Sequence, residues 1–208
     1  MQSPTRGIIG IIRGVTPDNA ESIAQAAFDG GIDTLEVALN SPDALSSISR
    51  IAANLPAGCS VGAGTVLTPE AVSATHHAGG TFIVAPNVTP DVIKRASVLG
   101  MNSYPGVATP TEALTALEAG ATAIKIFPAI QVTSAGMGAW RAILPDETGI
   151  FPVGGVGPAE FAEWIAAGAT GFGIGSGLYK PSFTADEVRD RAATIIRTWN
   201  ELTGGAQS

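Results

Sequence analysis

The segment Glu118-Ala-Gly-Ala-Thr-Ala-Ile-Lys-Ile-Phe-Pro128 contains a helix end, a glycine and an apolar strand in immediate succession. Glycine just past a helix end adopts the left-handed conformation that closes a helix at low steric cost. The apolar and β-branched residues that follow are typical of a buried strand. The same order of helix end, glycine and apolar strand recurs at residues 29–37, 78–84, 99–104 and 167–174. This rhythm predicts a chain built from repeated βα units.

The starts of the expected helices carry a second repeated signal. Serine or threonine can cap a helix, proline fits its first turn, and an acidic residue there complements the helix dipole. This order occurs at Thr16-Pro17-Asp18, Ser41-Pro42-Asp43, Thr68-Pro69-Glu70, Thr89-Pro90-Asp91 and Thr109-Pro110-Thr111-Glu112. The signals together predict helices near residues 17–29, 41–54, 68–79, 89–99, 109–119, 134–143, 157–167 and 184–202.

The expected strands alternate with these helices, near residues 7–13, 33–39, 59–64, 81–85, 101–104, 121–127, 150–153 and 170–174. Regular alternation favours a parallel sheet in an α/β fold. Eight such units in 208 residues favour a single (β/α)₈ TIM barrel domain that spans residues 1–208. A doubly wound sheet is less favoured, because no glycine-rich dinucleotide fingerprint follows the first strand.

The composition narrows the class of protein. Hydrophobic residues make up 45% of the chain and charged residues 14%, which supports a large core and is compatible with self-association. A net charge of −7 without a Lys/Arg run disfavours a nucleic-acid partner. Cys59 is the only cysteine, so no intrachain disulfide can form, as suits a reducing cytosol. With no signal-like start and no membrane-length apolar run, we expect a soluble cytoplasmic protein without a membrane partner.

Lys125 stands in the middle of an apolar strand. Side chains alternate along a strand, so Lys125 shares a face with Ala123 and Phe127. Lysine is almost never buried without a partner or a purpose. One interpretation is a structural ion pair with an acid. The other is an amine whose pKa is lowered by desolvation, so that it attacks a carbonyl as the free base. This strand alone leaves both interpretations open.

Glu36 is expected on the inner face of the second strand. The alternation places Leu35, Val37 and Leu39 under the helices and places Thr34, Glu36, Ala38 and Asn40 inside the barrel. A buried carboxylate needs a cation or a catalytic role. Lys125 is its simplest cationic partner, and such a pair at a barrel mouth is also what imine chemistry with proton transfer requires. We therefore favour a functional role for Glu36.

Other candidate residues follow from where barrel active sites lie, at the carboxyl ends of the strands. Arg13 ends the first strand, where its guanidinium can bind a carboxylate or phosphate in a forked geometry; a surface arginine is the alternative. Thr65 offers a hydroxyl after the glycine-rich third strand. The end of the fourth strand, with Pro86, is turn-like and by itself unspecific.

Two glycine-rich loops predict a phosphate site. Gly154 and Gly155 follow the seventh strand, and Gly175 and Ser176 follow the eighth. Loops in these places of a barrel bind phosphate through backbone N–H groups, which an acidic protein can also do. His76-His77 is the only pair of histidines, and adjacent helical residues face different directions. With no metal-ligand spacing elsewhere, we expect no metal site.

Several motifs together resemble a known family, the class I aldolases that act on 2-keto-3-deoxy-6-phosphogluconate and its phosphogalactonate counterpart. The resemblance covers nearly the whole chain and rests on Leu35-Glu36-Val37, Gly62-Ala63-Gly64-Thr65-Val66-Leu67, Ile83-Val84-Ala85-Pro86-Asn87, Pro105-Gly106, Ile124-Lys125-Ile126-Phe127-Pro128 and Val153-Gly154-Gly155-Val156. It implies a (β/α)₈ barrel, a homotrimer, and chemistry without a cofactor.

The resemblance also implies roles for individual residues. Lys125 matches the family's Schiff-base lysine, and Glu36 matches its general acid/base. Two further positions match those that contact pyruvate, and three match the phosphate loop; they are Thr65 and Pro86 for pyruvate and Gly154, Gly155 and Ser176 for phosphate.

Some positions separate the branches of this family. The gluconate enzymes carry Arg-Thr after the second-strand leucine and a threonine before the Gly-Gly pair. Here these positions are Asn40-Ser41 and Val153, and Arg13 ends the first strand. This pattern is similar to the phosphogalactonate branch. It implies cleavage of 2-dehydro-3-deoxy-6-phosphogalactonate to pyruvate and D-glyceraldehyde 3-phosphate, with Arg13 on the substrate carboxylate and Val153 influencing the C4 configuration.

Other functions remain compatible with these residues. The enzyme could act on the gluconate epimer, or on both epimers. A phosphosugar isomerase or synthase could use Lys125 and Glu36 without an imine. A non-catalytic metabolite sensor could be built on the same barrel. Borohydride trapping of an imine separates an aldolase from the last two.

Overall fold

The computed structural model describes residues 5–204, so residues 1–4 and 205–208 of the predicted domain lie outside the described part. The strands are β1 Gly7–Ile11, β2 Thr34–Ala38, β3 Ser60–Gly64, β4 Phe82–Val84, β5 Asn102–Tyr104, β6 Gly106–Val107, β7 Ala123–Ile126, β8 Gly149–Pro152 and β9 Gly171–Ile174. The helices are α1 Ala20–Asp29, α2 Ala44–Ala53, α3 Pro69–His77, α4 Pro90–Val98, α5 Pro110–Glu118, α6 Ala129–Val132, α7 Ser134–Trp140, α8 Phe161–Ala166 and α9 Ala185–Thr203.

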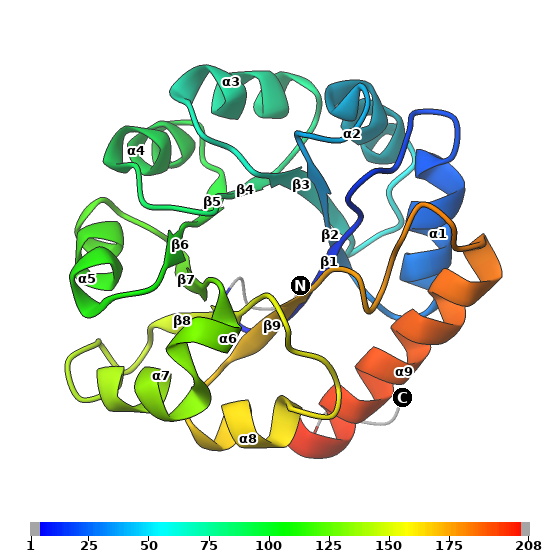
Figure 1. Ribbon diagram of the computed structural model, residues 1–208. Coiled ribbons are helices and arrows are strands. Elements are labelled where there is room, and N and C mark those ends of the chain that lie inside the picture. Colours follow the sequence, from blue (N-terminus) through cyan, green and yellow to red (C-terminus); the bar gives the residue numbers. More distant parts are fainter. Residues whose placement is uncertain (1–4, 205–208) are drawn as a thin grey trace.

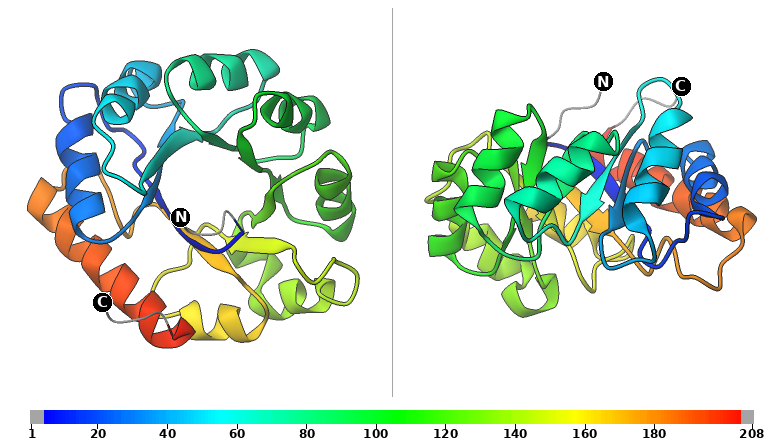
Figure 2. Two further views of the ribbon diagram at one scale, coloured as in Figure 1. Left: turned by 180° about the vertical axis from the view of Figure 1, so that it is seen from behind. Right: turned by 90° about the horizontal axis from the view of Figure 1, so that it is seen from above.

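The strand pairs between residues 5 and 204 are all parallel. One sheet has the order β5-β4-β3-β2-β1-β9 and the other the order β6-β7-β8. An isolated parallel bridge between Val153 and Gly173 joins the end of β8 to β9. Figures 1 and 2 show the strands gathered around a central axis with the larger helices outside them. The prediction of an α/β fold with parallel strands is confirmed.

The two faces of the strands pack into different cores. Leu35, Ile124 and Ile126 belong to the large core that also contains helix residues. The other face forms a smaller cluster of Ile9, Phe82, Val84, Tyr104, Ala123 and Phe151. Ala123 lies in this second cluster while its neighbour Ile124 lies in the first, so the predicted alternation along β7 is confirmed. The smaller cluster therefore lies on the same face of β7 as Lys125 and gives that face apolar surroundings.

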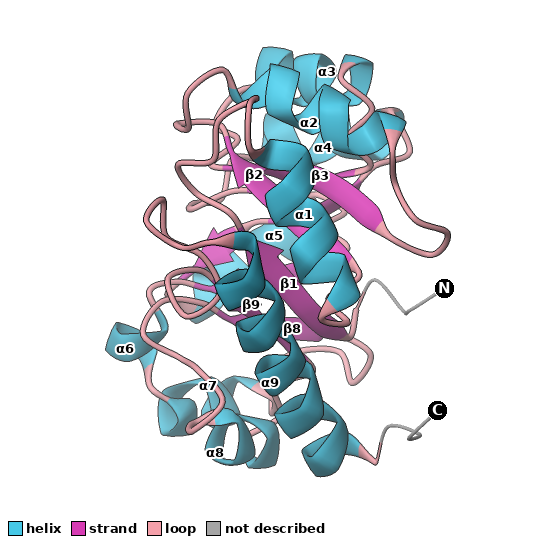
Figure 3. Cartoon of the chain, turned by 90° about the vertical axis from the view of Figure 1, so that its right-hand side faces the viewer, coloured by secondary structure: helices cyan, strands magenta, loops and turns pink. Residues whose placement is uncertain are grey.

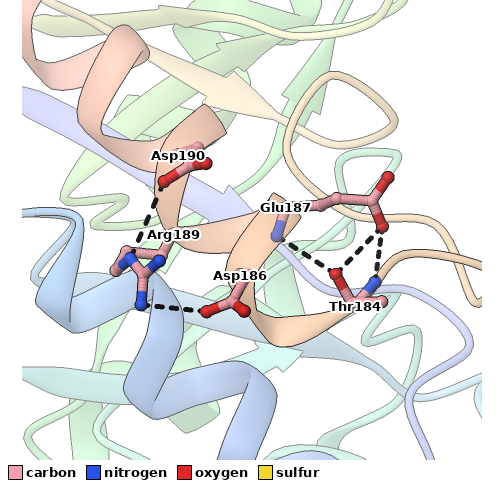
Figure 4. A network of polar contacts seen from close by, with 5 residues as sticks. All are labelled: Thr184, Asp186, Glu187, Arg189 and Asp190. Carbon is pink, nitrogen blue, oxygen red and sulfur yellow. Dashed lines mark hydrogen bonds and ion pairs between the residues drawn. The ribbon is translucent and has the colours of Figure 1, made fainter.

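Several predicted helix starts are confirmed. Thr68 and Thr109 accept hydrogen bonds from backbone N–H groups at the start of α3 and α5. The long helix α9 begins with a complete capping box (Figure 4). There the Thr184 hydroxyl accepts from the Glu187 N–H at 3.3 Å, and the Glu187 carboxylate accepts from the Thr184 N–H at 2.8 Å. These caps satisfy backbone groups that a helix start otherwise leaves unpaired.

Two predicted helix starts were wrong, at Thr16 and Ser41. The Asn19 carboxamide accepts a hydrogen bond from the Thr16 N–H at 2.9 Å, so residues 16–19 form a turn and α1 begins at Ala20. The Ser41 hydroxyl accepts instead from the N–H of Gly14 in another loop, and α2 begins at Ala44. In both places a competing hydrogen bond replaces the expected cap.

The region around β7 also differs from the prediction. Gly106, the residue after Pro105, begins the short strand β6, which pairs with β7 and was not among the predicted strands. The helix expected at 134–143 is α7, which is shorter, and the short helix α6 before it was not predicted. The helix expected at 157–167 is α8, which is shorter because it begins only at Phe161. Figure 3 shows α6 at the left edge of the molecule, away from the layer of outer helices. Its position directly after β7 places it beside the candidate site.

Candidate active site

Lys125 lies on β7, and only 6% of its surface is exposed. Its Nζ lies 4.5 Å from the centroid of the Phe127 ring, one strand position of the same face further on. Burial lowers the pKa of Lys125, Glu36 opposes this shift, and Arg13 adds to it. The environment therefore shifts Lys125 toward the free base, which is the form of an amine that attacks a carbonyl.

Glu36 lies on β2 and is 2% exposed. Burial raises the pKa of Glu36, while the charges of Lys125 and Arg13 act to lower it. Its Oε2 has no hydrogen-bond partner among residues 5–204, and no ion pair joins Glu36 to Lys125 within that range. The two groups influence each other through space without a closed salt bridge. A buried carboxylate with an open oxygen can accept or deliver a proton.

Gly64 allows Glu36 to take this position. The two residues lie on neighbouring strands, with Glu36 beside Gly62 and Ala38 beside Gly64 in the register of β2 and β3. A Cβ atom at position 64 would overlap Oε1 of Glu36 and would stand 2.7 Å from its Cδ. The absence of a side chain at Gly64 therefore gives the carboxylate its space.

Replacing Gly64 with alanine is expected to displace the Glu36 carboxylate and lower kcat by about tenfold or more, because small misplacements of a reacting group are costly. The measurement is kcat for the reaction that the family resemblance implies, with a melting curve to show that the variant is folded. Gly136→Ala in α7 is the matched control, because a Cβ there meets nothing closer than 3.5 Å. An unchanged kcat in folded Gly64→Ala would show that the carboxylate position does not matter.

Arg13 and Thr65 come together at the ends of β1 and β3. The Arg13 Nη1 donates to the Asn40 carboxamide oxygen, and its Nη2 donates to the Thr65 hydroxyl at 3.4 Å. Thr65 has a φ of +59°, a conformation that a β-branched residue rarely adopts. Strained backbone of this kind clusters at functional sites. The exposed Arg13 thus presents a held guanidinium at the same rim as Glu36 and Lys125, whose pKa values it affects.

Pro86 and Val153 lie at the ends of β4 and β8. Pro86 is half-buried, and its carbonyl group lies against Gly106 so closely that a Cβ at Gly106 would stand 2.5 Å from the carbonyl carbon. Val153 is buried, and its side chain lies over Gly173, where an added Cβ would stand 2.6 Å from Cγ2. Val153 therefore presents apolar surface at this end of β8.

The predicted phosphate loops are open backbone turns. Gly154 and Gly155 have φ values of +93° and +81°, which suit glycine. A Cβ at Gly154 would lie 3.5 Å from the Phe127 ring, so this loop reaches the aromatic side chain that also contacts Lys125. After β9, Ser176 is exposed in a turn that the Leu178 and Tyr179 N–H groups close on the Gly175 carbonyl.

Sequence reasoning gave no role to three residues that the structure brings into the site. Asn40 holds Arg13, Gly64 makes room for Glu36, and Phe127 contacts Lys125. The strand alternation had placed Asn40 and Phe127 on the correct faces. Nothing local indicated that Asn40 would hydrogen-bond a residue 27 positions away.

The described part of the chain contains neither a cluster of metal-ligand side chains nor a membrane-spanning helix. Between residues 5 and 204, no three His, Cys, Asp or Glu side chains come together as metal ligands. In the same range, no helix has the length and apolar character to cross a bilayer.

The fold and this site define an α/β protein with a buried lysine and a buried carboxylate at the carboxyl ends of parallel strands. The family model for KDPG and KHG aldolase matches residues 4–194. The chain belongs to the KDPG/KHG aldolase family.

The individual proteins that this chain resembles point to one branch of the family. The chain is 45% identical to a probable 2-dehydro-3-deoxy-6-phosphogalactonate aldolase of Rhizobium meliloti, over 97% of this chain and 95% of that protein. It is 43% identical to the 2-dehydro-3-deoxy-6-phosphogalactonate aldolase of Escherichia coli, over 93% of this chain and 95% of that protein. A solved structure described as native KDPGal matches with a TM-score of 0.92 and 43% identity, over 95% of this chain and 96% of that chain.

Proposed function

We propose that this aldolase, a carbon–carbon lyase, cleaves 2-dehydro-3-deoxy-6-phosphogalactonate to pyruvate and D-glyceraldehyde 3-phosphate through a Schiff base on Lys125. The observation that carries the proposal is a lysine exposed to only 6%, whose pKa is lowered, within electrostatic reach of a carboxylate exposed to only 2%, that of Glu36. The relatives named for this substrate, which match over nearly their whole length, support the substrate choice.

The reaction begins when the free amine of Lys125 attacks the C2 ketone of the substrate. Loss of water gives a protonated imine, which accepts the electron pair of the C3–C4 bond as that bond breaks. Glu36, directly or through a water, takes the proton of the C4 hydroxyl and later helps to protonate the enamine carbon. Hydrolysis of the imine then releases pyruvate and restores the amine.

The remaining candidate residues bind the two ends of the substrate. Arg13 and Thr65 bind the carboxylate, and Pro86 contacts the pyruvate portion. Val153 presents an apolar surface without a hydroxyl, which biases the configuration accepted at C4. Binding at both ends positions the bond that breaks between them. The backbone N–H groups and hydroxyl of the two glycine-rich loops bind the phosphate, namely those of Gly154, Gly155, Gly175 and Ser176.

The surrounding architecture completes the proposal. We infer that the two sheets close into a (β/α)₈ barrel as one domain, with the Val153–Gly173 bridge as part of the closure. We also infer a homotrimer, which the family resemblance implies and with which the 45% hydrophobic composition is compatible. We infer a cytoplasmic location, which suits the free thiol of Cys59. The pathway that we propose for the enzyme is the degradation of galactonate. A net charge of −7 does not suit a protein that binds nucleic acid, because the phosphate backbone is also negatively charged.

Incubation with pyruvate and borohydride tests the imine. We expect a reduced pyruvate adduct confined to the Lys125 peptide in mass spectrometry. The initial trapping rate should rise with pH and reach its plateau below the ordinary pKa of lysine, because the lowered pKa of Lys125 frees the amine there. An isomerase, a synthase or a sensor would give no adduct, and that result in folded protein would overturn the proposal. Comparing kcat/KM for the galactonate and gluconate epimers then tests the substrate choice.

A further inference from the structure

Two consecutive residues after β2, Asn40 and Ser41, hold Arg13 and its loop from two directions. Asn40 contacts the side chain of Arg13, and Ser41 contacts the backbone of the next residue, Gly14. Both partners lie 27 positions earlier in the chain, so these contacts join the loop after β1 to the loop after β2.

Ser41 fixes the loop backbone. Only 7% of Ser41 is exposed, its N–H donates to the Ala38 carbonyl at 2.8 Å, and its hydroxyl accepts from the Gly14 N–H at 2.8 Å. Gly14 has a φ of +86°, and a Cβ there would stand 3.0 Å from the Pro181 ring. The backbone that follows Arg13 is therefore held between the β2 loop and the loop after β9.

Asn40 fixes the guanidinium. A guanidinium has five N–H donors on one rigid plane. The Asn40 carboxamide accepts from Nη1 and the Thr65 hydroxyl accepts from Nη2 at 3.4 Å. Both contacts fix the plane, and the remaining donors stay available for an anion. Without them, an exposed arginine would sample many rotamers and would bind a carboxylate less often in the forked geometry.

We propose that Asn40 and Ser41 are positioning residues that orient Arg13 toward the carboxylate of the 2-keto acid. This inference rests on the proposed function, in which Arg13 binds that carboxylate. It assigns to the β2 loop a role in affinity for the pyruvate end of the substrate, separate from the phosphate end. The neutral carboxamide of Asn40 matters as well, because it holds Arg13 without neutralising its charge.

Pyruvate isolates the carboxylate end, because it carries that group and the reacting ketone but no phosphate. The experiment measures the rate of borohydride trapping on Lys125 against pyruvate concentration. In Asn40→Ala, which loses a hydrogen bond to the charged guanidinium, we expect the half-saturating concentration to rise by about tenfold. In Ser41→Ala, which loses a neutral hydrogen bond to the Gly14 N–H, we expect a smaller rise, of about fivefold. The maximal trapping rate and the inhibition of aldol cleavage by inorganic phosphate should stay unchanged.

Further variants separate positioning from a general structural effect. Ser41→Thr keeps a hydroxyl and should restore the half-saturating concentration. Asn40→Asp should raise it more than Asn40→Ala does, because a carboxylate there pairs with Arg13 and repels pyruvate. In an Arg13→Ala background, neither Asn40→Ala nor Ser41→Ala should add to the loss, since the residue they position is gone. Asn40 is exposed, so its variants test the proposal even where a Ser41 variant fails to fold.

The outcomes distinguish this inference from the function on which it rests. Additive losses in the Arg13→Ala background would overturn the positioning role. Unchanged half-saturation in both single variants, with the unmodified protein trapped normally, would also overturn it while leaving the aldolase chemistry intact. Absence of trapping in the unmodified protein would overturn the proposed function and this inference together.

Discussion

Replacing Lys125 with methionine is expected to abolish aldol cleavage and borohydride trapping together. Methionine fills a similar volume but carries no amine, so no imine can form. The fold should remain, because a buried ammonium weakens rather than strengthens it. The folded pKa of Lys125 lies below its ordinary value. The loss of folding stability caused by burying the Lys125 ammonium is therefore complete at pH values below its pKa in the folded state. This loss disappears above its pKa in the unfolded state. At neutral pH, Lys125→Met should melt at an equal or higher temperature.

Mass spectrometry and steady-state kinetics measure the effect of Lys125→Met on the same protein sample. Lys94→Met is the matched control, because Lys94 is an exposed lysine on α4 and should change neither readout. Appreciable cleavage by Lys125→Met would exclude the Schiff-base role. A pyruvate adduct on the Lys94 peptide of the unmodified protein, in place of the Lys125 peptide, would also exclude the Schiff-base role of Lys125.

Replacing Glu36 with glutamine is expected to lower kcat by about 10²-fold or more, the range typical of a lost general acid/base. The variant keeps the shape of the side chain and removes its ability to exchange a proton. Imine formation with pyruvate should persist, because Lys125 remains. The control is Asp33→Asn, at the other end of β2, where burial also raises the pKa of the carboxyl group. A change in kcat within about threefold for Glu36→Gln would make Glu36 structural.

The same substitution should change how stability depends on pH. Burial raises the folded pKa of Glu36 above its ordinary value of 4.5. Below pH 4.5 the carboxyl group is protonated in both states and costs no stability. As pH rises toward the raised pKa, the unfolded state loses its proton first and stability falls. Glu36→Gln should therefore melt at a higher temperature than the unmodified protein at pH 7, with the difference vanishing in acid. Thermal unfolding at several pH values measures this, and a lower melting temperature for the variant at pH 7 would contradict the shift.

The sequence predicted the strands other than β6, and most helices, because their signals are local. Glycine after a helix end and threonine-proline at a helix start act over a few residues, as at α3 and α5. From the chain alone, alternation along β2 predicted Glu36 on the inner face, and alternation along β7 predicted Lys125 on the same face as Ala123 and Phe127. The predictions failed where a local signal competed with another partner, as at Thr16, which hydrogen-bonds Asn19.

Only the tertiary structure decided how the site is assembled. The lysine and the carboxylate come from strands of two different sheets, and their opposite pKa shifts arise from burial that no single segment produces. Gly64 makes room for Glu36, and Asn40 holds Arg13, through contacts between different strands and loops. Short-range patterns determine elements because they act within one turn or one strand. Desolvation and side-chain contacts depend on which elements meet, and that is fixed only when the whole chain packs.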